Sequence, residues 1–470
     1  GLTPSQKLSE YHRILNREAR VVIGARSAVF APVPDLGLII IDEEHDGSYK
    51  SGSTPRYHAR QVAMYRCKKQ KIPLVMGSAT PSVEAWYLMN TKTIARHTLS
   101  KRLAGGKMPQ IKAIDLKNEP ADTLCISREL EHEINKTLAE KKQTILFLNR
   151  RGFTHFYRCR SCGFELKCKN CSVSLTYHKA ENRLRCHYCG WSTTPPQQCP
   201  QCGSLDAGYS GFGTEFIESE VKAKFPNARI VRMDTDNLTK KGELQEKINA
   251  FKNNEYDIML GTQMVAKGLN FPNLKLVGVI LADTALHLPD FRSAERTFSL
   301  ITQVAGRAGR FFPDGKVLVQ TYSPEREPIL FSVNNQTQKF YEMEINNRRM
   351  LNFPPFCRLV RLVFRAPTEK QAVEAAEGAS SILRNELYAI YSQKISPDFT
   401  QEQKNKVAST EILGPAECPL SKIAGSFRWQ LILKGQDITI LQKAASNLFY
   451  NYSRPTDVYI ETDVDPVNLL

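Results

Sequence analysis

The sequence predicts an α/β protein with two parallel-sheet lobes, a metal-binding module inserted in the second lobe and a small α+β domain at the carboxyl end. Three observations lead to this prediction. Short β-branched runs alternate with helical stretches, which is the pattern of parallel α/β sheets. Eight of the 12 cysteines fall in closely spaced pairs inside one short segment. After about residue 330 the alternation gives way to longer helices and isolated strands.

Length and composition agree with a soluble protein of several domains. A chain of 470 residues exceeds the size of a single core, so about three domains are expected. No apolar run approaches the roughly 20 residues of a membrane helix, and no signal peptide opens the chain. Without an export signal we expect a cytoplasmic protein, whose thiolates bind metal and do not form disulfides. The net charge of +16 favours a polyanionic partner such as nucleic acid, with generic basicity as the alternative.

The apolar continuity of the predicted strands indicates burial on both sheet faces. In the first lobe, residues 1–102, the predicted strands are Val21–Ile23, Leu38–Ile41 and Leu74–Met76. A linker over 103–112 precedes the second lobe, 113–330, with strands at Ile145–Leu148, Ile230–Val231, Ile258–Leu260, Leu276–Ile280 and Val317–Val319. The last domain, 331–470, has predicted strands Leu359–Phe364, Trp429–Leu433 and Val458–Ile460, with Thr368 as a helix N-cap and a solvated loop over Lys394–Ser409.

Four Cys-x-x-Cys pairs interrupt the second lobe over 157–207. Each pair supplies two soft ligands from one tight turn, so four pairs make two tetrahedral zinc sites. We expect a nested arrangement, although the spacing alone also allows sequential pairing. The outer site then uses Cys159, Cys162, Cys199 and Cys202, and the inner site uses Cys168, Cys171, Cys186 and Cys189. Four thiolates fill the coordination sphere, so both zinc ions are structural and stabilise the module by roughly 10–16 kcal/mol each.

Three further motifs indicate nucleotide chemistry. The apolar strand that ends in Asp42-Glu43 has the form of a Walker B element, in which Asp42 holds Mg²⁺ through water and Glu43 orients the attacking water. An ordinary acidic turn is the alternative. The hydroxyl-rich turn 77–81 follows the next strand. Arg307 and Arg310, three residues apart after Gln303, lie on one helical face and can neutralise charge on a γ-phosphoryl group. A basic helix that faces solvent or RNA is the alternative there.

Together these blocks resemble the family of bacterial primosomal replication-restart helicases (PriA, or primosomal protein N′), which belongs to helicase superfamily two. The resemblance spans essentially the whole chain. The matching blocks are 23–30, 42–46, 56–60, 77–81, 147–152, the eight paired cysteines, 261–268, 289–292, 303–310, 322–324, 353–356, 414–415, 428–430 and 463–466.

The resemblance implies an ATP-dependent 3′-to-5′ DNA helicase with RecA-like lobes, the first of them partial. Implied cofactors are ATP, Mg²⁺ and two structural zinc ions. Implied partners are single-stranded and branched DNA, primosome proteins, single-stranded DNA-binding protein and replicative-helicase loading factors. Catalytic residues would be Asp42, Glu43, Gln303, Arg307 and Arg310, and coupling residues His45, Ser78, Thr80, Gly268 and Asn270. DNA-binding residues would be Arg26, Tyr49, Lys50, Tyr57, His58, Arg150 and Thr262.

The sequence departs from the family pattern in three places. Asn270 stands where the family has Asp, which would weaken hydrolysis, and Ala25 stands where Thr is usual. No Gly-x-x-x-x-Gly-Lys-Ser/Thr loop occurs, so we expect that element upstream of this sequence and little ATPase activity from this chain alone. A DNA-binding remnant that does not hydrolyse ATP is the alternative. An RNA helicase with a zinc insertion is disfavoured by the carboxyl-terminal matches.

Overall fold

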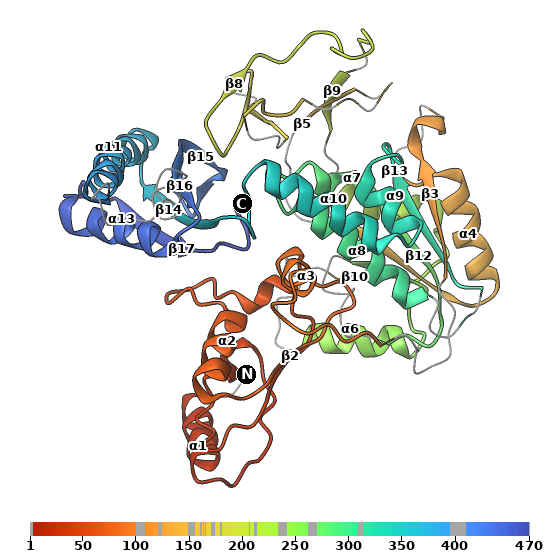
Figure 1. The fold of residues 1–470 in the computed structure, drawn as a ribbon. Helices are drawn as coiled ribbons and strands as arrows, with labels where there is room; N and C mark the ends of the chain where they lie inside the picture. Colours follow the sequence, from red (N-terminus) through yellow and green to blue (C-terminus); the bar gives the residue numbers. More distant parts are fainter. Residues whose placement is uncertain are drawn as a thin grey trace.

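In the part of the chain that the computed structural model describes, there are four sheets, of two, six, four and five strands (Figure 1). The structure describes residues 3–99, 109–120, 125–148, 156–159, 162, 164, 166–170, 174–178, 181–205, 207–210, 214–233, 242–261, 270–308, 312, 314–394 and 410–469. Among these residues no helix is both long and apolar enough to cross a membrane.

The amino-terminal region is built on two parallel strands, β1 (Ile39–Ile41) and β2 (Leu74–Met76), which lie within the predicted strands. Its helical elements are α1 (Pro4–Leu15), η1 (Arg26–Phe30), η2 (Gly47–Tyr49), α2 (Ala59–Gln70) and α3 (Val83–Asn90). The predicted strand Val21–Ile23 is wrong, because these residues form no regular element. Val21 is 75% exposed and Ile23 is 94% exposed. In the described structure these residues therefore lack a neighbouring strand to pair with, in spite of their β propensity.

The second lobe is a six-stranded sheet, and all of its strand pairs are parallel. In spatial order its strands are β10 (Ile230–Met233), β11 (Ile258–Gly261), β4 (Gln143–Leu148), β12 (Leu274–Ile280), β13 (Lys316–Thr321) and β3 (Gln110–Asp115). All five predicted strands of this lobe are confirmed. β3 was not predicted; it begins at Gln110, inside the predicted linker, and is followed by the short turn η3 (Leu116–Asn118).

Helices cover both faces of this sheet (Figure 1). Because successive side chains of a strand point to opposite faces, Ile145 and Leu146 belong to different core clusters. The cluster around Ile145 includes side chains of α6 (Glu243–Lys252), α7 (Asp283–Leu286), α8 (Ser293–Ala308) and α9 (Glu327–Val333). The cluster around Leu146 includes α4 (Arg128–Ala139) and α5 (Thr214–Lys224). The sheet is therefore buried on both faces, as the apolar runs predicted.

The cysteine-rich module is inserted between β4 and α5 and forms a five-stranded antiparallel sheet. In spatial order its strands are β8 (Ser192–Thr193), β7 (Arg183–Arg185), β6 (Thr176–His178), β5 (Phe156–Cys159) and β9 (Ala207–Ser210). The strands are short, so metal ligation and packing on neighbouring elements must hold the module together.

A carboxyl-terminal antiparallel sheet follows α10 (Thr337–Met350). Its strands are β15 (Glu411–Ile423), β16 (Ser426–Gly435), β14 (Arg358–Ala366) and β17 (Tyr459–Val464). α11 (Glu369–Lys394) and α13 (Ile438–Asn451) pack on one face. Thr368 is the predicted N-cap, with its Oγ1 accepting from the Gln371 amide. β15 was not predicted. With this domain the predicted α/β fold class is confirmed; the loop predicted over Lys394–Ser409 lies almost wholly outside the described residues.

Candidate functional site

The first candidate site lies at the carboxyl end of β1. Asp42 is exposed there, and its Oδ1 accepts a hydrogen bond from the Glu43 amide at 3.0 Å. Glu43 has a left-handed φ of 48° and lies 3.6 Å from the His45 ring through its carboxylate. Tyr49 donates its hydroxyl to the Asp42 carbonyl at 2.6 Å. An exposed carboxylate at a strand end is suited to holding a hydrated Mg²⁺.

Polar contacts join this strand end to the second lobe. Gln303 lies on α8, and its Nε2 is 2.5 Å from His45 Nε2 and 2.9 Å from Thr80 Oγ1. On its other side, His45 Nδ1 lies 2.7 Å from Ser78 Oγ. The amide of Gln303 donates to His45 Nε2 if the His45 ring carries its proton on Nδ1, which then donates to Ser78. Four predicted site residues from three separate sequence blocks therefore form one connected network.

The structure describes two further predicted residues of this site. Arg307 lies in the last turn of α8, four residues after Gln303. Asn270 is exposed and precedes the buried Phe271, whose ring meets that of Phe251. Gly268, Arg310, Arg150 and Thr262 lie outside the described residues. The arginine-finger roles of Arg307 and Arg310 stay predictions.

A cavity of about 950 Å³ lies beside the network. Its wall combines residues that follow β1, residues of α2, α3 and α8, and residues that follow β17. Glu44, His45, Arg292, Gln303 and Asp465 are among the lining side chains. The cavity therefore lies where both lobes and the carboxyl-terminal domain meet, and charged groups of both signs line it.

The predicted DNA-binding residues of the amino-terminal region are mostly engaged with protein. Arg26 donates to the carbonyl oxygens of Ser48 and Lys50 at 3.1 and 3.3 Å. Lys50 is buried and pairs with Asp463 at 2.8 Å, so its ammonium reaches DNA only if this pair opens. Tyr57 packs edge-on against Phe30. These contacts hold the loop on the protein in this conformation.

His58 is also buried and acts as a cap. It precedes α2, and its Nδ1 accepts from the Arg60 amide at 3.2 Å. Burial, together with the charges of Arg60 and Lys50, lowers the pKa of His58 to about 3. The ring is therefore neutral at physiological pH, and a charged contact with a DNA phosphate is not available to it.

A buried charge network between the lobes was not predicted from the sequence. Arg348 of α10 pairs with Glu295 of α8 at 2.7 Å and with Glu344 at 2.8 Å. Glu295 also accepts from the Val83 amide at the start of α3, at 2.8 Å. Burial alone would raise the pKa of Glu84, but Arg292 and Arg348 outweigh it and lower that pKa to about 2. Glu84, Glu295 and Arg348 lie far apart in sequence, and no local motif marks their contacts.

Buried Glu44 is a second unpredicted group, two residues beyond Asp42. Its carboxylate accepts from the Ser82 amide at 2.5 Å and from Arg60 at 2.6 Å. It thereby fixes the turn after β2 to the end of β1. The sequence signal that could have found it is the run of three acidic residues, of which one points inward.

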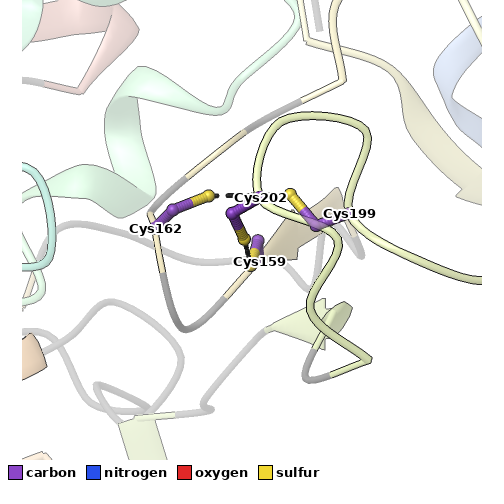
Figure 2. A group of neighbouring side chains, drawn as sticks. All are labelled: Cys159, Cys162, Cys199 and Cys202. Atoms are coloured by element: carbon purple, nitrogen blue, oxygen red, sulfur yellow. Dashed lines mark hydrogen bonds between the residues drawn. The ribbon is translucent and has the colours of Figure 1, made fainter.

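The second candidate site is the outer cysteine cluster, shown in Figure 2. Ligand atoms of Cys159, Cys162, Cys199 and Cys202 all lie within 4.8 Å of one another. The Cys159–Cys202 and Cys162–Cys199 sulfur atoms are each 3.6 Å apart. A tetrahedral zinc with Zn–S bonds of about 2.3 Å separates its sulfurs by about 3.8 Å. The cluster therefore fits zinc, and its pairing is the nested one expected from the sequence.

The inner cluster brings together Cys168, Cys186 and Cys189, with a Cys168–Cys189 sulfur separation of 3.6 Å. Its predicted fourth ligand, Cys171, lies outside the described residues. A glycine follows the second cysteine of three of the four pairs, and the two of these glycines that the structure describes, Gly190 and Gly203, have φ values of +76° and +72°. This left-handed backbone closes the metal-binding turn and strains any residue except glycine.

The inner cluster packs on the carboxyl-terminal domain. Leu184 and Tyr188 share a core cluster with Phe353 and with Ile432 of β16. The residues on either side of Ile432 in β16 belong to the cluster on the opposite face of that sheet. The Tyr188 hydroxyl accepts from the Phe291 amide at 2.9 Å, just before α8. The module is therefore anchored to both the second lobe and the last domain.

Three family models match parts of the chain. The "Helicase conserved C-terminal domain" matches residues 212–312. The "PriA DNA helicase Cys-rich region (CRR) domain" matches 168–193, and the "Primosomal protein N C-terminal domain" matches 349–467. With a parallel sheet covered on both faces, these matches define the class of protein as a helicase.

Curated relatives identify the family within that class. The chain is 46% identical to the replication restart protein PriA of Treponema pallidum over all of this chain and 68% of that protein. It is 38% identical to the Bacillus subtilis protein of the same name, over 57% of its length, and 38% identical to that of Borreliella burgdorferi, over 67%. The chain belongs to the replication restart protein PriA family. A solved structure of RecG bound to a three-way DNA junction aligns with 74% of this chain and 35% of that one, at 14% identity and a TM-score of 0.40.

Proposed function

We propose that this chain forms the motor and DNA-engaging part of an ATP-dependent 3′-to-5′ DNA helicase that acts in replication restart. The observation that carries the proposal is the contact of Gln303 with both His45 and Thr80. One side chain of the second lobe thereby bonds to the residues that follow both β1 and β2. Such a junction can couple nucleotide chemistry at one lobe to movement of the other.

In this proposal Asp42 holds Mg²⁺ through water and Glu43 orients the attacking water. Nucleotide binding and hydrolysis at that site are coupled to Gln303 through the hydrogen-bond network of His45, Ser78 and Thr80. The γ-phosphoryl charge is neutralised by Arg307 and Arg310. The sequence holds no Gly-x-x-x-x-Gly-Lys-Ser/Thr loop. Hydrolysis is therefore proposed for the chain acting together with such a loop, and little hydrolysis for the chain by itself.

The proposed substrate is single-stranded or branched DNA, in keeping with the net charge of +16. Proposed protein partners are those of the primosome, single-stranded DNA-binding protein and the loading factors of the replicative helicase. Both cysteine clusters hold zinc as a structural ion, because four thiolates leave no position for a substrate.

The test measures DNA-stimulated ATP hydrolysis and unwinding of duplexes with a 3′ or a 5′ single-stranded tail. It uses this chain and the same chain extended through its upstream coding sequence. We expect unwinding of the 3′-tailed duplex by the extended chain. Arg307→Ala should lower hydrolysis by about 10³-fold or more, and Arg128→Ala, on the exposed surface of α4, should leave it unchanged. Unwinding from the 5′ tail would overturn the proposed polarity.

The second candidate is a DNA-binding protein that does not hydrolyse ATP, favoured by Asn270 and by the lack of the phosphate loop. An upstream sequence with a stop or frameshift before any phosphate loop would support it. Asn270→Asp in the extended chain tests whether the missing carboxylate at this position lowers ATP hydrolysis. Increased hydrolysis would indicate that the carboxylate was needed. DNA-stimulated hydrolysis by this chain alone, abolished by Asp42→Asn, would contradict both the low activity expected of the isolated chain and this second candidate.

A further inference from the structure

A third group of metal-binding side chains lies between the cysteine-rich module and the carboxyl-terminal domain. His178 ends β6, His187 follows β7, and Glu417 comes from β15. Ligand atoms of these three residues lie within 4.8 Å of one another. None of the three belongs to a Cys-x-x-Cys pair or to the inter-lobe network.

The His187 side chain is prepared to act as a ligand. It is buried, with 1% of its surface exposed, and its Nδ1 lies 2.7 Å from the Glu417 carbonyl oxygen. Since a carbonyl only accepts, Nδ1 carries the proton and Nε2 keeps a lone pair. That Nε2 is buried and has no hydrogen-bond partner in the described part of the chain. A metal-bound histidine has this arrangement, in which a carbonyl orients the ring through its other nitrogen.

His178 and Glu417 complete the group. His178 Nδ1 lies 3.3 Å from Glu417 Oε2, and the two imidazole rings are 5.2 Å apart. The Nε2 of His178 is also buried and without a hydrogen-bond partner among the described residues. Two buried imidazole nitrogens without hydrogen-bond partners beside one carboxylate are costly in the absence of a cation, because buried polar groups are otherwise almost always satisfied.

One positive charge, that of Arg185, lies beside the group and is partly offset. Arg185 is 3.2 Å from Glu417 and also pairs with Glu181 at 2.6 Å, so two carboxylates share its charge. His187 lies in sequence between Cys186 and Cys189 of the inner cluster. A zinc ion held by four thiolates has a net negative formal charge, which offsets further positive charge nearby.

We infer that His178, His187 and Glu417 form a third metal site, of the two-histidine, one-carboxylate type, which takes Zn²⁺ and joins the cysteine-rich module to β15. Tetrahedral zinc separates such nitrogen and oxygen ligands by about 3.3 Å, which small side-chain rotations reach from the present positions. Three protein ligands leave one coordination position for water. The site bridges two parts of the chain that are already packed together through Gln430, which donates to the His187 carbonyl at 2.6 Å.

Zinc stoichiometry tests the inference. The 470-residue chain is equilibrated with excess Zn²⁺, desalted and analysed for zinc per chain. We expect about three zinc ions per chain, whereas the cysteine clusters alone account for about two. Two ions in the wild-type chain under these conditions would overturn the site, and this measurement needs no variant.

Variants locate the third ion. His187→Asn keeps a donor for the Glu417 carbonyl but removes the ring Nε2, and Glu417→Gln keeps the side-chain shape but removes the anionic ligand. Each should lower the content by one zinc. His132→Asn, on the exposed side of α4, should leave it at three. Three ions retained in both site variants would overturn the assignment to these residues.

Spectroscopy gives a readout that does not depend on the folding of a variant. In the Co²⁺-loaded wild-type chain, thiolate-to-metal charge-transfer absorption reports the cysteine sites. We expect that absorption to saturate with two equivalents while a third Co²⁺ remains bound after desalting. Loss of the third Co²⁺ on desalting would count against the site.

Discussion

Apolar β-branched side chains are exposed in the two-stranded sheet of β1 and β2, whereas the six-stranded sheet buries them. Ile40 of β1 is 65% exposed and Val75 of β2 is 49% exposed, whereas Ile145 of β4 is 1% exposed. Helices pack on both faces of the six-stranded sheet. In the described structure, Ile40 and Val75 of the two-stranded sheet are not covered by a helix in this way. A two-stranded sheet is at best marginally stable alone, so the amino-terminal region depends on contacts with the rest of the chain.

Besides the contacts of Gln303 and Lys50 described above, one group of those contacts lies at α3. Trp86 stacks on Tyr341 of α10 with ring centroids 4.2 Å apart, and Val83 packs in the same cluster with Phe298. The charges of Arg348 and Glu295 lie beside this cluster. Within the described residues, the six-stranded lobe has a core of its own, and α3 of the amino-terminal region packs on α8 and α10.

The largest expected effect comes from breaking the interface charge network. Arg348→Leu leaves Glu295 and Glu344 buried without their partner, which should cost about 3–5 kcal/mol. The amino-terminal region should then be cleaved first in limited proteolysis, with the six-stranded lobe intact. Lys339→Ala on the exposed side of the same helix is the matched control. Simultaneous loss of both lobes would show that they unfold as one unit and would break the comparison.

A packing change should act on the second lobe alone. A Cβ at Gly278 of β12 would lie 2.7 Å from Leu146 Cδ2 and 3.1 Å from Leu130 Cδ1. Gly278→Ala should therefore destabilise by about 1–3 kcal/mol through overpacking, measured as a lower urea midpoint. At Gly306 of α8 a Cβ would meet nothing within 4 Å, so Gly306→Ala serves as the control. An equal loss at both positions would exclude overpacking as the cause.

Acid should weaken the amino-terminal region through His58. Its pKa is about 3 in the folded chain, below the ordinary value of 6.5, so the unfolded state binds a proton that the folded state does not. Stability is therefore fully present above pH 6.5 and falls as the pH decreases toward 3. His58→Asn keeps an acceptor for the Arg60 amide and should flatten this slope in urea unfolding. An unchanged slope would exclude His58 as its source.

The smallest effect should come from the exposed strand face. Ile145→Val in β4 should cost about 0.5–1.5 kcal/mol, because the side chain is buried. Ile40→Val in β1 should change stability by less than about 0.5 kcal/mol. A cost at Ile40 equal to that at Ile145 would show that β1 is covered in solution.

The structural features that a local sequence pattern encodes were predicted correctly. The strands of the second lobe were predictable because apolar runs mark buried parallel strands, and the cysteine pairs because ligand spacing is set by the metal. β15 was not predicted, because Gly414 and Pro415 interrupt its apolar pattern and its register shifts between Leu413 and Ala416. Val21–Ile23 shows the converse: strand propensity without a neighbouring strand does not make a sheet.

The candidate site divides in the same way. The residues after β1 and β2 and the glutamine of α8 were predicted as site residues, and the structure brings them together. The burial of Lys50 and His58 could not be predicted, because Asp463 and the other groups around them come from distant segments. The same holds for Arg348 with Glu295 and for His178 with Glu417, since pairs so far apart in sequence leave no periodic signal.

The hydrogen bond from the Phe291 amide to Tyr188 has a mechanical consequence. Phe291 lies two residues before α8 begins at Ser293, and α8 carries Gln303. A shift of this helix along its axis pulls directly on the ring between two zinc-binding cysteines. Tyr188 thus links the cysteine-rich module to the start of the helix whose Gln303 contacts the opposite lobe, and a displacement of that helix would act on this bond.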